Sequence, residues 1–122
     1  MDMPTLKKTL IHNLSAFSIP SELGMNQLIL ITAAGTITGE LLTTSDEENE
    51  LTSVNIITQY IKKVGTTYKQ DYEIPEQQEL AGNDGYIILK NVTIQNGSSK
   101  TTVPVLAVFF DQIIAVTVGN LN

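Results

Sequence analysis

The side chains that could carry out chemistry in this chain are few and scattered. His12 is the only histidine, and the sequence holds no cysteine. These two facts exclude a metal site made of several histidines, a thiolate metal site, a cysteine nucleophile and a disulfide framework. A single histidine beside Ile11, in a stretch with helical spacing, is more often a partly buried structural residue than a catalytic base. We therefore assign no catalytic role to His12.

Carboxylates are the second group of candidates. Four of them lie close together in the middle of the chain, at Asp46, Glu47, Glu48 and Glu50. Such oxygens bind hard cations, but their spacing lacks the regular pattern of an EF-hand loop. Asp111 could serve as an acid if it were buried, although aspartate is also common in turns. We interpret all five as surface, helix-start or turn residues, so the sequence predicts no enzyme activity, no metal site and no cofactor.

Length and charge narrow the function classes further. The chain has 122 residues and a formal net charge of −6, which favours one domain whose summed field repels phosphate. Nucleic-acid binding is therefore not the first expectation. No apolar run approaches the roughly 18–20 residues of a membrane span, and the first residues lack an apolar core of secretory length. We expect a cytoplasmic protein that does not enter membranes.

The first third of the chain predicts a helix and then a β-hairpin. Helical spacing relates Leu6, Leu10, Ile11 and Leu14, and Pro4 suits the first turn of such a helix. The apolar run 27–33, the turn Ala34–Gly35 and the alternating segment 36–43 predict two paired strands. Gly39 lies inside the second strand, where a residue without a side chain indicates a strong bend or a bulge.

The middle of the chain fits two interpretations. Ser45 and Glu48 form a capping box, and apolar residues then recur at helical spacing at Leu51, Val54, Ile57, Ile61 and Val64. Residues 51–64 are also rich in β-branched side chains and partly fit strand alternation. We predict a helix that ends near Gly65, with a strand as the alternative, and a polar loop over residues 65–85. Tyr60, Tyr68 and Tyr72 in this region form either an interface patch or ordinary packing.

The last third predicts three apolar strands. The strand 86–95 is followed by the turn Asn96–Gly97, and two apolar runs between residues 103 and 121 then meet at Asp111–Gln112 as a C-terminal hairpin. These runs are apolar on both faces, so both faces have to be covered by the same domain or by a neighbouring subunit. We expect an oligomer interface on these strands, with Val105, Val108, Phe110, Ile114 and Val116 as its residues.

The order helix, strand, strand, acidic insertion and three strands resembles the Sm-like (LSm) family. The resemblance is carried by GTITGELL at 35–42, YIILKNVTIQNG at 86–97 and VLAVFFDQIIAVTV at 105–118. It implies a mainly β fold with helices, a single domain over residues 1–122 with an insertion at 46–85. An N-terminal helix and five bent antiparallel strands would form a small Sm-like or SH3-like β-barrel. Members of this family pair their last two strands between subunits to form rings, which implies a homo-oligomer.

The resemblance also implies a ligand site. In the family an acid, an aromatic and an asparagine at the third strand hold a stacked base. Asp84 and Tyr86 take the first two places, and Ile88 takes the place of the asparagine; a register anchored on Leu89 instead puts Tyr86 there. The arginine–glycine pair that the family has before its last strand corresponds to Asp111–Gln112, with reversed charge.

Asp84, Tyr86 and Asp111 are therefore the predicted ligand-binding residues. The leading hypothesis is a non-enzymatic, homo-oligomeric scaffold or interaction module, because the site lacks the amide and the cation that would hold base edges and phosphate. The alternative is a protein that binds single-stranded RNA through Tyr86 and surface lysines such as Lys90 and Lys100.

Overall fold

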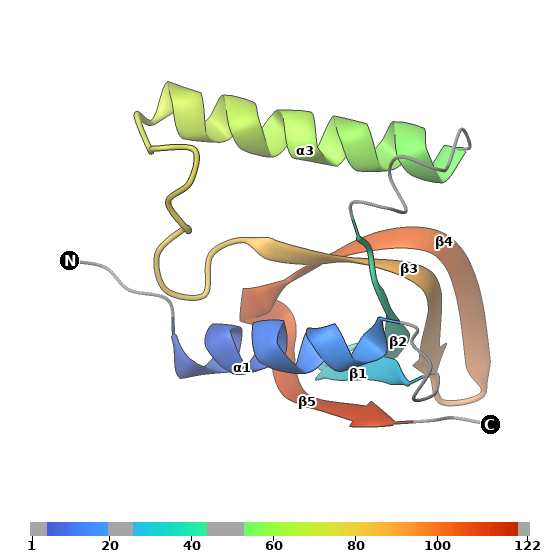
Figure 1. Cartoon of the computed structure of the whole chain (residues 1–122). Coiled ribbons are helices and arrows are strands. Elements are labelled where there is room, and N and C mark those ends of the chain that lie inside the picture. Colours follow the sequence, from blue (N-terminus) through green and yellow to red (C-terminus); the bar gives the residue numbers. More distant parts are fainter. Residues whose placement is uncertain (1–4, 20–25, 44–52, 120–122) are drawn as a thin grey trace.

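The protein is mainly β, with five antiparallel strands in one sheet and two α-helices. The computed structural model describes residues 5–19, 26–43 and 53–119. The elements in chain order are α1 (Leu6–Ser15), η1 (Ala16–Ser18), β1 (Gln27–Thr32), β2 (Gly35–Leu41), α3 (Ser53–Asp71), β3 (Tyr86–Asn96), β4 (Ser99–Phe109), η2 (Phe110–Gln112) and β5 (Ile113–Gly119). The strands lie in the order β4-β3-β2-β1-β5, and the sheet is strongly curved (Figure 1). The predicted mainly β fold with an N-terminal helix is confirmed.

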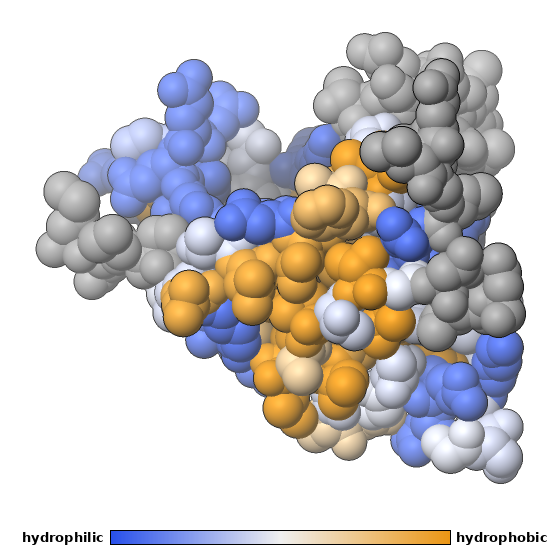
Figure 2. Space-filling view, turned by 60° about the horizontal axis from the view of Figure 1, so that its bottom comes forward, coloured by the Kyte–Doolittle hydropathy of each residue, from blue (hydrophilic) through white to orange (hydrophobic). Residues whose placement is uncertain are grey.

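Helix α1 begins at Thr5, whose hydroxyl oxygen accepts a 3.2 Å hydrogen bond from the backbone N–H of Lys8. The apolar stripe predicted for α1 is partly buried and partly exposed. Ile11 is fully buried against the sheet, whereas Leu6 and Leu10 are exposed. Figure 2 shows that apolar side chains gather on the face that carries α1 and β5. The chain thus leaves part of this predicted core face uncovered.

The predicted β1–β2 hairpin is confirmed, with Thr32 opposite Gly35 and Leu28 opposite Gly39. A Cβ atom at Gly39 would lie 3.2 Å from the backbone oxygen of Lys90 and equally near two side chains of β3. The pairing of β2 with β3 also shifts register between Thr38 and Glu40. Gly39 is therefore required for close approach of β2 to β3 at a bulge, as its position in the sequence predicted.

The predicted hairpin between the last two strands is wrong. Asn96–Gly97 does turn the chain, with Gly97 at φ +61°, but this turn joins β3 to β4. Strand β4 begins at Ser99, so Lys100 lies in a strand and not in a turn. Strand β5 pairs with β1, with Leu30 opposite Val116, at the other edge of the sheet. The turn η2 redirects the chain, and the curvature of the sheet brings β5 beside β1 instead of β4.

The ambiguous middle segment is a helix, and it is longer than predicted. Helix α3 continues past Gly65 to Asp71. At its end the ammonium of Lys69 donates to the backbone oxygens of Glu76 and Gln78, and Ile74 N–H donates to the oxygen of Lys69 at 2.7 Å. These bonds satisfy backbone and side-chain polar groups at the C-terminus of the helix. They explain why the helix continues beyond Gly65. The predicted capping box at Ser45 and Glu48 lies outside the described residues.

The core lies between α1 and the concave side of the curved sheet. It consists of Ile11, Leu28, Leu30, Ile87, Leu89, Val92, Val108, Phe110 and Ile113. Full burial of one such side chain contributes about 1.5–3 kcal/mol. Val105, Val108 and Phe110, three residues predicted to face a neighbouring subunit, have their side chains buried within their own chain. The described parts of the chain include no helix long and apolar enough to cross a membrane.

Candidate functional site

The residues predicted to bind a ligand lie at the start of β3 and in η2, two segments that the fold brings together. The backbone N–H of Phe110 in η2 donates to the oxygen of Gly85 at 3.1 Å, just before β3. This bond places the start of β3, with Asp84 and Tyr86, beside the loop that carries Asp111. What these three residues can do chemically depends on where their side chains point.

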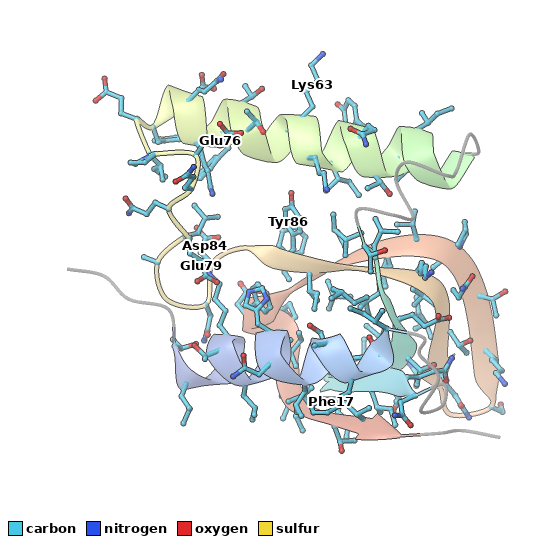
Figure 3. All side chains as sticks on the ribbon, viewed as in Figure 1. Phe17, Lys63, Glu76, Glu79, Asp84 and Tyr86 are labelled. Atoms are coloured by element: carbon cyan, nitrogen blue, oxygen red, sulfur yellow. The ribbon has the colours of Figure 1, made fainter. Side chains whose placement is uncertain are left out.

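The side chain of Tyr86 is engaged by α3 and β4. It points toward α3 (Figure 3), and its hydroxyl donates to the backbone oxygen of Ile61 at 3.3 Å. Its ring meets the ring of Phe109 edge-on, with 5.9 Å between the centroids. Burial raises the pKa of the Tyr86 phenol above its ordinary value, because the charged phenolate is disfavoured away from water. Tyr86 therefore joins α3 to the sheet.

Asp84 and Asp111 are both exposed, and each carboxylate has a local partner. Oδ1 of Asp84 accepts from the N–H of Gly85 at 2.9 Å. Oδ1 of Asp111 lies 3.5 Å from the side-chain nitrogen of Gln112, at the long end of hydrogen-bond distances. Both acids thus shape turns and add negative charge at this end of the sheet.

The most deeply placed polar residue at these loops is Lys8, which sequence reasoning missed. Lys8 is only 2% exposed, and its ammonium donates to the backbone oxygens of Leu80 and Asp84, both at 2.7 Å. The ammonium lies 5.4 Å from the ring centroid of Phe110. A buried cation is costly unless its donors are satisfied, and here they are satisfied by a loop distant in sequence. Lys8 therefore binds the segment before β3 to α1.

Glu79 and His12 extend this cluster to the surface. A carboxylate oxygen of Glu79 lies 3.7 Å from the Lys8 ammonium and 3.1 Å from Nε2 of His12. The centroid of the His12 ring lies 5.1 Å from that of Phe110, although the histidine is exposed and not partly buried as predicted. A signal for Lys8 existed in the sequence, because it shares a helix face with Ile11 and Ser15, three and seven residues later.

The two edges of the sheet are the second candidate surface. Strands β4 and β5 are its outermost strands, so each has one side that the sheet leaves unpaired. Phe109 at the end of β4 is 55% exposed, and Ile114 near the start of β5 is 67% exposed. Of the five predicted interface residues, Ile114 exposes most of its side chain and Val116 is partly exposed.

An open groove of about 400 Å³ runs along one side of α3. It is lined by Tyr60, Lys63, Val64, Thr67, Tyr68 and Asp71. These positions recur every three or four residues and therefore form one face of the helix. Two of the three tyrosines that the sequence analysis singled out in this region contribute to it.

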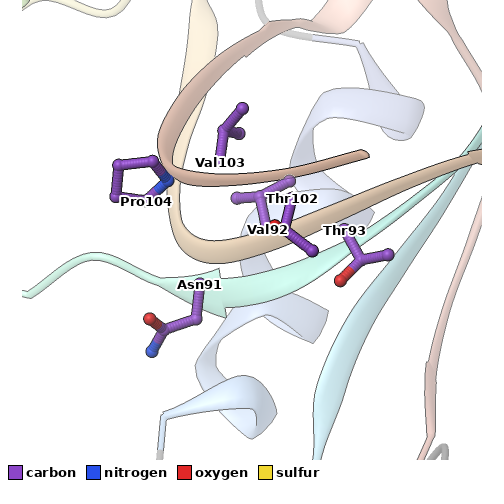
Figure 4. A pocket seen from close by; sticks show the side chains of 6 residues that line it. All are labelled: Asn91, Val92, Thr93, Thr102, Val103 and Pro104. Atoms are coloured by element: carbon purple, nitrogen blue, oxygen red, sulfur yellow. The ribbon is translucent and has the colours of Figure 1, made fainter. Parts of the chain in front are cut away.

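A second open groove, of about 360 Å³, lies at the bend of the β3–β4 hairpin (Figure 4). It is lined by Asn91, Val92, Thr93, Thr102, Val103 and Pro104. Asn91 has φ +51°, and its amide donates to Oε2 of the buried Glu40 at 3.0 Å. Pro104 lacks a backbone N–H and is tolerated because β4 is an outer strand. The uninterrupted pairing edge of β4 therefore begins at Val105.

Within residues 5–19, 26–43 and 53–119, no three or more metal-ligating side chains lie close enough together to bind one metal ion. The carboxylates at 46–50 lie outside these ranges. The function of the chain has to be inferred from its own residues and geometry, because comparison with protein-family models, curated proteins and solved structures finds no match.

Proposed function

We propose that this chain is a non-enzymatic subunit of an Sm-like homo-oligomer, which serves as a scaffold or interaction module. The observation that carries the proposal is the position of β4 and β5 at opposite edges of one curved antiparallel sheet. An unpaired edge presents backbone donors and acceptors that another strand can satisfy. The β5 edge of one copy can therefore pair with the β4 edge of the next.

Such a contact joins two different surfaces, so each copy keeps one free edge for a further copy. Heterologous contacts of this kind produce a closed ring when the rotation between neighbours closes, and an open filament when it does not. The strand order, the N-terminal helix and the insertion before β3 support an Sm-like subunit, in which the curved sheet forms a small barrel.

Side chains near the two edges fit this arrangement. Val105 and Val108 are buried, so this part of β4 offers its backbone while these two side chains stay inside the subunit. On β5, the exposed Ile114 lies near the edge of the sheet. On α1, Leu6 is 84% exposed. Exposed apolar side chains on two elements of one face are typical of an interaction site.

The test is the mass of the protein in solution, measured by light scattering after size-exclusion chromatography at several concentrations. Wild type is expected to be larger than a dimer, because a closed set of heterologous contacts needs at least about three copies. Ile114→Glu places a charge in the contact and is expected to reduce the mass to a dimer or less.

The matched control is Gln77→Glu, which adds the same charge at an exposed position in the loop between α3 and β3. It is expected to keep the wild-type mass. A wild-type monomer at high micromolar concentration would contradict the proposal, as would a folded Ile114→Glu variant with unchanged mass.

Binding of single-stranded RNA stays a prediction of lower rank. It would require Tyr86 to leave its contacts with Phe109 and α3, or the base to stack elsewhere. Fluorescence anisotropy with labelled oligouridine and oligoadenine tests it. Affinity that falls with added salt and with Lys100→Ala would favour it, and absence of binding at low salt would remove it.

A further inference from the structure

Helix α3 stands apart from the rest of the fold. Among the described residues of its inner side, Thr58 is fully buried, and the backbone oxygen of Ile61 accepts a hydrogen bond from the hydroxyl of Tyr86. A Cβ atom at Gly65 would lie 3.0 Å from that hydroxyl, so the glycine lets the tyrosine approach closely. Figure 1 shows the helix on the outside of the molecule, beyond β3.

The outer side of α3 combines exposed apolar and aromatic side chains with two opposite charges. Tyr60 is 68% exposed and Val64 51% exposed, and both line the groove described above. Lys63 points away from the sheet in Figure 3 and lies one turn after Tyr60, which begins this face, while Asp71 ends it. We call the six groove-lining residues the outer face of α3.

The composition of α3 indicates that this face is covered. Within its 19 residues, the β-branched residues are Val54, Ile56, Ile57, Thr58, Ile61, Val64, Thr66 and Thr67, and Gly65 lies in the interior. Residues of these types have low helix propensity, so a helix made of them depends on packing for its stability. The exposed outer side of the helix is available for further packing.

We propose that the outer face of α3 binds the same face of a second copy of this chain, with the two helices antiparallel about a two-fold axis near Thr67. Charge complementarity identifies the occupant. Lys63 and Asp71 lie four residues on either side of Thr67, about 6 Å along the axis in each direction. A two-fold axis at Thr67 therefore brings Lys63 of each copy opposite Asp71 of the other, and forms the ion pair twice.

The same axis places apolar groups together. Val64 of one copy meets the neighbourhood of Tyr68 of the other, and the small Thr67 at the centre permits close approach of the helices. Self-complementary contacts of this type are isologous, unlike the heterologous edge contacts proposed above. The inference does not depend on the edge contacts and goes beyond them, since it predicts a separate self-association.

Charge reversal tests the pairing. Lys63→Asp and Asp71→Lys each replace two attractive pairs by two repulsive ones, and each is expected to weaken the self-association at least about tenfold. The double variant K63D/D71K restores attraction and is expected to return the dissociation constant to within about threefold of wild type. Sedimentation equilibrium measures these constants, and far-UV circular dichroism verifies that each variant is folded.

Site-specific cross-linking tests the axis. Because the chain has no cysteine, Thr67→Cys introduces a single thiol at the centre of the proposed contact. It is expected to form a disulfide-linked dimer under mild oxidation, since residues near a two-fold axis come within disulfide range. The matched control is Thr66→Cys, equally exposed but on another side of α3, which is expected to stay largely uncross-linked.

These experiments separate this inference from the edge contacts. Lys63→Asp should halve the mass of a larger assembly, or reduce a dimer to a monomer, whereas Ile114→Glu should leave the Thr67→Cys cross-link intact. The α3 pairing is overturned if both charge reversals leave the mass unchanged, if the double variant fails to restore it, or if the Thr66 and Thr67 thiols cross-link equally.

Discussion

The curved sheet and helix α3 place their apolar side chains in opposite environments. In the sheet, Leu28, Leu30 and Leu89 are fully buried. In α3, large apolar side chains remain exposed, among them Tyr60 and Val64. The sheet is thus stabilised within one chain, whereas α3 exposes several apolar side chains within the part of the chain that the structure describes. An apolar pattern therefore does not by itself predict whether a face is buried by its own chain.

The largest loss of stability is expected for a substitution in the core of the sheet, compared with one on the exposed side of α3. Leu89→Ala removes a fully buried side chain and should lower the free energy of unfolding by about 2–5 kcal/mol. Val64→Ala, at a half-exposed position on α3, should change it by less than about 0.5 kcal/mol in the dissociated protein. Urea denaturation at low protein concentration measures both. Equal losses for the two variants would show that α3 is packed as tightly as the sheet.

A medium effect is expected at the link between the N-terminus and the segment before β3. Lys8→Met keeps most of the apolar stem but leaves the oxygens of Leu80 and Asp84 without their donor. The loss should be about 1–3 kcal/mol, with faster hydrogen exchange in residues 79–85. Lys100→Met, at an exposed position of β4, is the control and should cost less than about 0.5 kcal/mol. Unchanged exchange in residues 79–85 would argue against Lys8 as the residue that holds this loop.

The smallest effect concerns Tyr86, the residue that connects the two regions. Tyr86→Phe removes the hydrogen bond to Ile61 and should cost about 0.5–1.5 kcal/mol at neutral pH. Because burial raises the phenol pKa in the folded state, the folded protein holds this proton more tightly than the unfolded chain. The contribution is therefore complete below about pH 10, the unfolded value, and is lost as the pH rises through the folded pKa.

Denaturation of wild type and Tyr86→Phe at pH 8 and above pH 10 checks the sign. Wild type should lose more stability on this rise than Tyr86→Phe does. Tyr72→Phe, at an exposed tyrosine just after α3, is the matched control and should follow wild type. A steeper alkaline loss in Tyr86→Phe than in wild type would contradict burial as the cause of the raised pKa.

Signals between near neighbours predicted much of the fold. The turns at Ala34–Gly35 and Asn96–Gly97, the glycine at the β2 bulge and the helical spacing before Gly65 all act over a few residues. They were sufficient for α1, for both hairpins that exist and for the type of α3. They failed at Asp111–Gln112, where a turn between two apolar strands was interpreted as a third hairpin.

The sequence by itself determined where strands and helices form and which faces are apolar, because backbone preference and side-chain period are local properties. Tertiary structure alone decided that β5 pairs with β1, that Lys8 meets a loop 72 residues away, and that Tyr86 faces α3. These outcomes depend on the curvature of the whole sheet and on closing long loops. The free energies that select such contacts depend on residues far apart in the sequence, so they cannot be derived from a short segment.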